Sequence, residues 1–231
     1  MAEIYTIQET VELPSHGKLY KDVPESLTLR SMTTEEEMRR LSQKDSYYKR
    51  MCDVVDACII EPMTISSYDM CLGDYQALLY GLRTVTYGSV VTNSTICPYC
   101  GALNNEDLDL YSLEKYPFKE LTNEDFEIKL PRSQSIIRIK LHTPRILDEI
   151  DKEIEDYKAN NKQDSRDPSL LITLKHSIEY VDGEHYDPIK LDMFLRKLPM
   201  ADTNVLAQKV LKFNDNIGIN TNVKSKCDSC G

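Results

Sequence analysis

Two cysteine motifs constrain this chain more than any other feature of its sequence. They are Cys97-Pro98-Tyr99-Cys100-Gly101 and Cys227-Asp228-Ser229-Cys230-Gly231, both of the pattern CxxCG, and residues 102–226 lie between them. The two-residue spacing lets a tight turn direct both thiolates at one ion, and four thiolates satisfy the tetrahedral coordination of Zn²⁺. The sequence therefore predicts one structural Zn²⁺ per chain, shared by Cys97, Cys100, Cys227 and Cys230.

The segments that precede the two motifs are also alike. Residues 88–96 and 218–226 each begin with glycine, are polar and contain several β-branched side chains. Because β-branched residues favour strands, we expect each segment to be a short strand that enters its cysteine-containing turn, or knuckle. Two such halves would complete a zinc-ribbon-like element, with the intervening chain as an insertion. Four protein ligands would leave no open coordination position for a catalytic water.

Other uses of the cysteine pairs remain open at this stage. The pairs could bind separate metal ions or none, and a CxxC pair can be a redox dithiol. A thioredoxin-like motif opens a helix, whereas no helical pattern follows either motif here. The other three cysteines of the seven are Cys52, Cys58 and Cys71, which flank or occupy predicted helices and are expected to be small buried side chains.

Charge and hydropathy exclude several classes of protein. The 28 Lys and Arg against 38 Asp and Glu leave a net charge of −10, which disfavours a nucleic acid as partner. A nucleic-acid-binding zinc ribbon is the most distant alternative, since only Lys212, Lys224 and Lys226 lie near the knuckles. No apolar run is long enough for a membrane span, and residues 1–8 lack the features of a signal peptide. We therefore expect a protein of the cytoplasm in which it is made.

The periodicities predict an α+β chain that is mostly helical, with the zinc-ribbon element and one β-hairpin. We expect helices near 33–41, 46–60, 72–87, 144–159, 170–181, 187–198 and 201–213, and a hairpin of 126–130 with 137–141. The expected organisation is an extended N-terminal arm (1–30) with one hairpin or turn at 13–17, a helical block (31–87), the first knuckle (88–103), an acidic connection and the hairpin (104–142), a second helical block (143–216) and the second knuckle (217–231), with residues 88–231 closed by the shared metal.

The sequence carries no recognisable catalytic constellation. The carboxylates of residues 148–156 are expected on a solvated helix face, and His16, His142, His176 and His185 show no metal-ligand spacing. No nucleophile motif or phosphate-binding loop occurs. We therefore expect no enzymatic activity, no small-molecule substrate and no membrane partner.

The N-terminal arm is the candidate surface for a protein partner. Its residues Leu13, Pro14, Gly17 and Tyr20 are apolar or conformationally special in a segment with little core periodicity. The alternative is that this arm packs on its own domain. We expect a partner contact at these four residues.

The order of several short segments resembles a known family. These are residues 11–20 (VELPSHGKLY), 27–37 (LTLRSMTTEEE), 59–62 (IIEP), 82–88 (LRTVTYG), 128–131 (IKLP) and 181–184 (VDGE), arranged around the two CxxCG motifs. This order is similar to that of the baseplate hub and hub-assembly proteins of contractile-tailed, T-even-like bacteriophages. Relatives usually continue past the second knuckle with another strand, so the resemblance implies a second half without its return strand.

The resemblance implies a non-enzymatic role in building the central hub of the tail baseplate, in the cytoplasm of the infected host. The partners would be other phage tail and baseplate hub proteins. The protein is expected to be an assembly factor, or chaperone, of the hub. The alternative implied by the same family is a structural hub component that stays in the virion baseplate.

Overall fold

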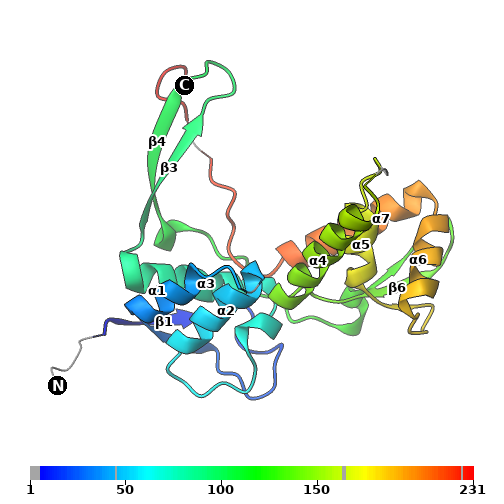
Figure 1. Cartoon of the computed structure of the whole chain (residues 1–231), viewed down its shortest axis with the longest axis horizontal. Helices are drawn as coiled ribbons and strands as arrows, with labels where there is room; N and C mark the ends of the chain where they lie inside the picture. Colours follow the sequence, from blue (N-terminus) through cyan, green and yellow to red (C-terminus); the bar gives the residue numbers. More distant parts are fainter. Residues whose placement is uncertain (1–5, 45, 163–164, 225) are drawn as a thin grey trace.

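The computed structural model describes residues 6–44, 46–162, 165–224 and 226–231. Figure 1 shows two bodies side by side and a two-stranded ribbon that projects from the first of them. The first body contains β1 (Gln8–Glu12), β2 (Ser26–Arg30), α1 (Thr34–Arg40), α2 (Tyr47–Cys58), the short 3₁₀ helix η1 (Ser67–Asp69) and α3 (Leu72–Tyr87). None of the helices within the described ranges is long and apolar enough to cross a membrane.

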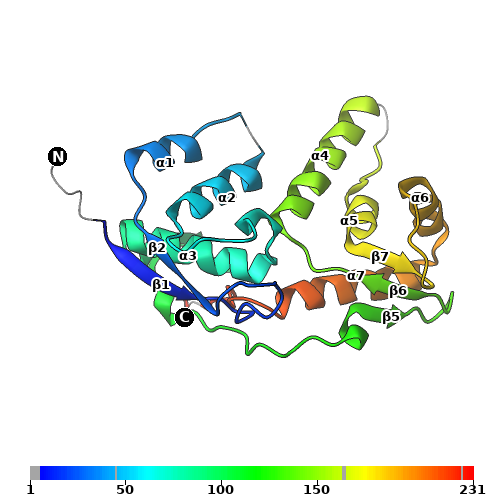
Figure 2. The ribbon, with the colours of Figure 1, turned by 90° about the horizontal axis from the view of Figure 1, so that it is seen from below.

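The second body holds α-helices, one 3₁₀ helix and a small sheet. Its elements are η3 (Asn123–Phe126), β5 (Glu127–Lys129), β6 (Ile136–Ile139), α4 (Pro144–Asn160), α5 (Ser169–Ser177), β7 (Ile178–Val181), α6 (Pro188–Lys197) and α7 (Met200–Asp215). The strands form an antiparallel sheet in the order β5-β6-β7, and Figure 2 shows helices on one side of it. The chain thus folds into a mixture of helices and small sheets, as expected.

The start of α1 and the end of α3 lie at capping residues that the sequence contains. Thr33 and Glu36 form the expected capping box at the start of α1. The helix α3 ends at Gly88, whose φ of +90° is costly for any residue with a Cβ. The starts and ends of the helices therefore follow from local chemistry.

One predicted helix is wrong at its end. Leu170, Leu174, Ile178 and Val181 have helical spacing, but α5 ends at Ser177 and residues 178–181 form β7. Ile178 and Val181 are buried in the core between this sheet and the helices. The strand satisfies the backbone groups of β6, which would otherwise be a second free edge, and this tertiary pairing outweighs the helical pattern.

Residues 8–30 do not project as an extended arm, but the hairpin or turn expected at residues 13–17 is present. They form the antiparallel β1-β2 hairpin, which packs on α3. Gly81 of α3 permits this approach, because a Cβ there would lie 2.2 Å from a methyl carbon of Val11. The turn that follows β1 is anchored by Asp74, a buried carboxylate that accepts hydrogen bonds from the Ser15 backbone and hydroxyl and from the Tyr20 hydroxyl.

A buried carboxylate joins the two bodies. Asp148 of α4 accepts hydrogen bonds from the backbone N–H groups of Tyr48 (3.2 Å) and Lys49 (2.8 Å) at the start of α2, and from the hydroxyls of Ser46 and Tyr68. The expectation of a fully solvated acidic face is therefore wrong at Asp148. The N-terminus of α2 lacks an acidic residue of its own in the first turn, and Asp148 supplies the missing negative group from a distant helix.

The ribbon consists of β3 (Val90–Ile96) and β4 (Leu103–Asp109), paired antiparallel over their full lengths. The first residues of the expected acidic connection, 104–109, therefore belong to β4. The chain then passes through η2 (Leu110–Ser112) towards the second body.

The second knuckle is reached differently from the first. No strand forms in the described part of residues 218–226, apart from an isolated bridge between Ile219 and Lys115. The prediction of two equivalent strand-and-knuckle halves is therefore wrong. The first knuckle lies on a hairpin whose two strands bond each other, whereas the described part of the C-terminal segment forms no ladder with either strand of that hairpin.

Candidate metal centre

The two knuckles have the same backbone geometry. In the first, the Gly101 N–H donates to the Cys97 carbonyl at 3.0 Å, and in the second the Gly231 N–H donates to the Cys227 carbonyl at 2.9 Å. Both glycines have positive φ, +73° and +89°, a conformation that residues with a Cβ adopt at a cost. The CxxCG pattern thus folds each time into a tight turn with both thiols on one side.

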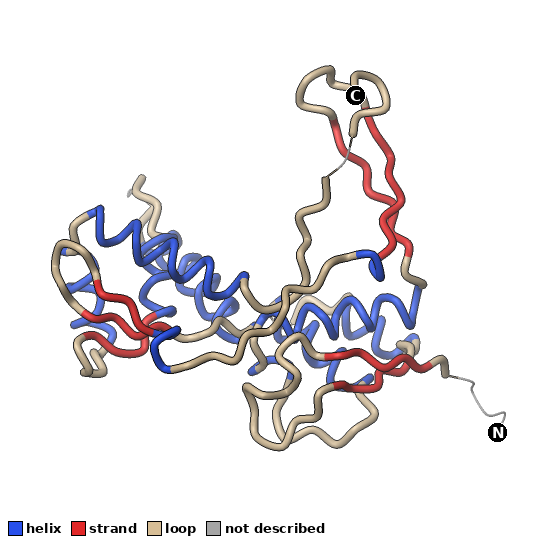
Figure 3. Tube along the Cα trace, turned by 180° about the vertical axis from the view of Figure 1, so that it is seen from behind, coloured by secondary structure: helices blue, strands red, loops and turns tan. Residues whose placement is uncertain are grey.

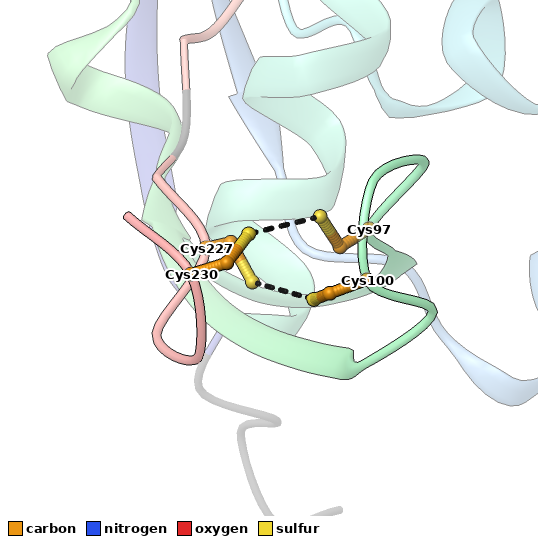
Figure 4. A group of neighbouring side chains, drawn as sticks. All are labelled: Cys97, Cys100, Cys227 and Cys230. Carbon is orange, nitrogen blue, oxygen red and sulfur yellow. Dashed lines mark hydrogen bonds between the residues drawn. The ribbon is translucent and has the colours of Figure 1, made fainter.

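The four sulfur atoms of the knuckles meet at the tip of the ribbon. Cys97 Sγ lies 3.7 Å from Cys230 Sγ, Cys100 Sγ lies 3.6 Å from Cys227 Sγ, and all four lie within 4.8 Å of one another (Figure 4). Zn–S bonds of about 2.3 Å in a tetrahedron would place the sulfurs about 3.8 Å apart. A disulfide needs roughly 2.0 Å. The separations therefore match four ligands of one tetrahedral ion.

Two segments that are distant in sequence are brought together to build this cluster. Figure 3 shows the ribbon and the extended C-terminal segment rising separately from the bodies and meeting only at the tip. Asn104 of β4 strengthens the meeting point, because its Oδ1 accepts a hydrogen bond from the Asp228 N–H at 3.2 Å and lies 3.5 Å from Cys227 Sγ. Sequence reasoning missed Asn104, and no pattern around it marks such a role.

Backbone donors bias the protonation of the thiols. The pKa of Cys227 falls to about 6, mainly because the Ser229 and Cys230 N–H groups point at its sulfur. The pKa of Cys97 is also lowered, by the N–H groups of Cys100 and Tyr99. The pKa of Cys230 rises to about 12 because the neighbouring sulfurs, Cys100 first, favour its protonated form. A mixture of thiolate and thiol is expected of four sulfurs this close, and a bound cation would favour the thiolates.

The other three cysteines are not part of this centre. Cys52, Cys58 and Cys71 are buried in the first body, as expected. Burial raises their pKa values to about 12, 11 and 12, so the nucleophilic thiolate is scarce near neutral pH. In the described ranges, the knuckle cysteines form the one group of three or more His, Cys, Asp or Glu side chains with metal-binding geometry.

The four N-terminal residues proposed for partner contact lie in the first body and not at the cysteine cluster. Leu13, Pro14 and Gly17 are buried in the first body, and the Tyr20 hydroxyl bonds to Asp74 and to the Cys71 N–H. A partner could not reach the three buried residues in this conformation. The contact proposed from the sequence stays a prediction; Leu13 belongs to the buried cluster of the first body, and Tyr20 packs against that cluster.

Two of the four histidines, His142 and His176, hydrogen-bond to side chains of the second body. His142 Nε2 lies 2.7 Å from the Ser177 hydroxyl, and His176 Nε2 lies 2.8 Å from Glu153. Burial lowers the pKa of His142 to about 4, so its ring is neutral near pH 7. These contacts link α4, α5 and the preceding loop, and neither histidine faces the cysteine cluster.

Comparison with known proteins bears on the family to which the chain belongs. A family model described as T4 bacteriophage base plate protein matches residues 4–231. No curated protein and no solved structure matches the chain. The family match covers both bodies, the ribbon and both knuckles. The chain therefore belongs to the T4 bacteriophage base plate protein family.

Proposed function

We propose that this protein is a non-enzymatic, zinc-binding factor that assists assembly of the central hub of a phage tail baseplate. The family match over residues 4–231 carries the proposal, because it supports a baseplate role for nearly the whole chain. The partners would be other tail and baseplate hub proteins. Assembly would take place in the cytoplasm of the infected host.

Zn²⁺ is the metal that suits the cysteine cluster best. Four soft thiolate donors in a tetrahedral arrangement favour Zn²⁺ over oxygen-preferring cations such as Mg²⁺ or Ca²⁺. The ion would be structural, since Cys97, Cys100, Cys227 and Cys230 would fill its coordination sphere. Its effect would be to fix the C-terminal segment to the ribbon tip.

The absence of catalysis is part of the proposal. A four-thiolate ion has no open position for substrate or water. A redox role for the first CxxC pair is disfavoured because its knuckle is followed by the strand β4, without the helix of a thioredoxin-like site. A structural metal site that joins two distant segments is typical of a protein whose role is to bind other proteins.

The role in assembly can be tested in a phage that carries this gene. Deleting the gene should leave infected cells with tail parts that lack complete hubs, and expression of the intact protein from a plasmid should restore infectious particles. Normal particles from the deletion phage would contradict a baseplate role. A plasmid encoding the Ser229→Ala variant, which keeps all four thiols, serves as the matched positive control.

Mass spectrometry of purified particles would separate an assembly factor from a structural component. As an assembly factor, the protein should be present with hub intermediates in infected cells and absent from finished virions. A fixed copy number in finished virions would contradict the assembly-factor role and identify a structural hub component. The count should be normalised to a known tail protein in the same particles.

A further inference from the structure

An apolar groove lies where the base of the ribbon meets the first body. It has a volume of about 650 Å³ and is lined by residues of α1, α3, the lower part of β3 and β4, and the start of the C-terminal segment. Most of the lining is apolar, including Leu79 and Leu82 on α3 and Val91 and Leu108 on the ribbon. Because Val91 and Leu108 face each other across the ladder, one face of the ribbon forms a wall of the groove.

The charged side chains of this groove are all positive. Two arginines, Arg40 and Arg83, line it, and no Asp or Glu does among the described residues, in a chain whose net charge is −10. Arg40 is paired with Glu37 at 2.6 Å, whereas Arg83 donates to two backbone carbonyls and forms no ion pair with a described carboxylate. The hydroxyl of Tyr80, one turn before Arg83 on α3, also lines the groove and makes no hydrogen bond to another described residue. The groove thus holds hydrogen-bond donors for an anion that this chain does not supply.

The groove continues along the ribbon towards its tip. A second hollow of about 200 Å³ shares Asn93, Leu108 and Thr221 with it and lies between the same face of the ribbon and the C-terminal segment. Residues 221–224 on that side form no strand ladder with any described residue. Glu106 is the carboxylate that lines the second hollow, so the positive end of the combined slot is its base. An elongated slot with backbone outside any ladder beside it suits an extended peptide segment.

We propose that this slot binds an extended segment of another baseplate protein, apolar in composition and carrying an acidic residue whose carboxylate pairs with Arg83. The inference rests on the proposed function, because it names the chemistry of a baseplate partner. The apolar side chains of the segment would cover the aliphatic lining, and its carboxylate would accept hydrogen bonds from the Arg83 guanidinium and the Tyr80 hydroxyl. Such charge-assisted hydrogen bonds are stronger in a groove from which water is displaced than on an open surface.

The position of Arg83 selects among possible occupants. A basic or neutral segment would cover the guanidinium with apolar side chains and leave its charge without a counter-ion, which costs free energy. A small amphipathic carboxylate would satisfy Arg83 but fill only the base of the slot. An acidic, apolar peptide segment uses both the donors at the base and the length of the ribbon face.

Binding of the full-length, zinc-loaded protein to an array of overlapping peptides tests the proposal. The peptides, each of about twelve residues, should cover the tail and baseplate proteins of the same phage and this chain itself. The segments that bind should be apolar and contain Asp or Glu. Val91→Glu, which puts a carboxylate into the groove, should weaken the best of them by about tenfold or more. Val90→Glu is the matched control, because Val90 is 53% exposed and the adjacent residue of a strand points to the opposite face.

Charge exchange tests the contact with Arg83 itself. Arg83→Gln keeps hydrogen-bond donors without the charge and should weaken binding of the best peptide by about tenfold. The same peptide with lysine in place of its acidic residue should bind the intact protein poorly and should bind Arg83→Glu better than it binds the intact protein. Zinc content and melting temperature show that each variant is folded.

Several outcomes would overturn the proposal. They are an array without bound peptides, bound peptides that lack an acidic residue, equal effects of Val91→Glu and Val90→Glu, or binding to segments of this chain alone. An amphipathic carboxylate extracted from the purified protein and displaced by Val91→Glu would identify a small ligand instead.

Expression of the variants in cells infected by the gene-deletion phage separates this inference from the baseplate role. Val90→Glu should restore infectious particles and Val91→Glu should not. Normal particles without the gene would contradict the baseplate role. A phage that needs the gene but is fully restored by Val91→Glu would contradict the peptide-binding slot alone.

Discussion

Replacing Cys227 by serine should release the C-terminal segment from the ribbon tip while both bodies stay folded. The two main buried clusters lie in the first body and in the second, and no described residue from Ile219 onwards belongs to either. The segment is held at its far end by the sulfur cluster and by Asn104. The change should therefore act locally.

The magnitude can be worked from the contacts of this segment. Ordering its ten described residues, 221–224 and 226–231, costs about 10–20 kcal/mol. The two polar contacts at Asn104 contribute about 1–3 kcal/mol. Binding of a structural Zn²⁺ contributes about 10–16 kcal/mol. The metal is thus the term that balances the ordering cost, and its loss should free the segment.

Elemental analysis and hydrogen exchange would measure this effect. Cys227→Ser should lower the zinc content from one per chain towards zero, and amide exchange should accelerate in residues 90–109 and 219–231 while α4 to α7 stay protected. Ser229→Ala is the matched control in the same knuckle and should keep its zinc. Full zinc content in Cys227→Ser would refute the shared site, and exchange throughout both bodies would refute the local account.

Three further outcomes concern the bodies. Cys52→Ser should keep the zinc but destabilise the first body by about 1–3 kcal/mol, since it replaces a buried thiol by a more strongly hydrated hydroxyl in the cluster of Met51, Tyr68 and Tyr75; an unchanged melting temperature would contradict this. Asp148→Ala should lower the free energy of unfolding by about 3 kcal/mol, because it leaves buried donors of α2 without an acceptor. Urea titration measures this loss, and the exposed control change Asp151→Asn should alter the free energy of unfolding little. The His142 pKa of about 4 lies below the ordinary value of 6.5, so the unfolded chain binds the proton more tightly and stability should fall as the pH drops from 6.5 to 4, by about 3 kcal/mol in all. His142→Gln should remove this part of the pH dependence; an equal slope in both proteins would show that other groups cause it.

Local signals explain how much of the fold could be predicted. The capping box at Thr33 and the glycine at position 88 mark α1 and the end of α3 correctly, because caps and positive φ values are decided within a few residues. Periodicity found the helices but misplaced Ile178 and Val181, which satisfy helical spacing and strand pairing equally well. The choice was made by the unpaired edge of β6, which lies about 40 residues earlier.

The candidate metal site was likewise predictable only in part. Spacing within each CxxCG motif predicted that two thiols face one side, and the likeness of the motifs predicted that the four sulfurs meet; the cluster confirms their proximity. Asn104 and the pairing of β3 with β4 were not predictable, because the polar residues 103–109 carry no alternation of apolar side chains. The identity of the metal stays a prediction for elemental analysis.

The sequence by itself determined the two knuckle turns, the caps of the first helices and the family of this protein, since each depends on short segments of fixed spacing. Only the tertiary structure decided that the first knuckle has its own complete hairpin, that Asp148 serves a helix about 100 residues away, and that Leu13 belongs to a core. The physical reason is that strand pairing, burial and long-range hydrogen bonds depend on which distant backbone and side-chain groups lack a partner, and the order of residues does not state this.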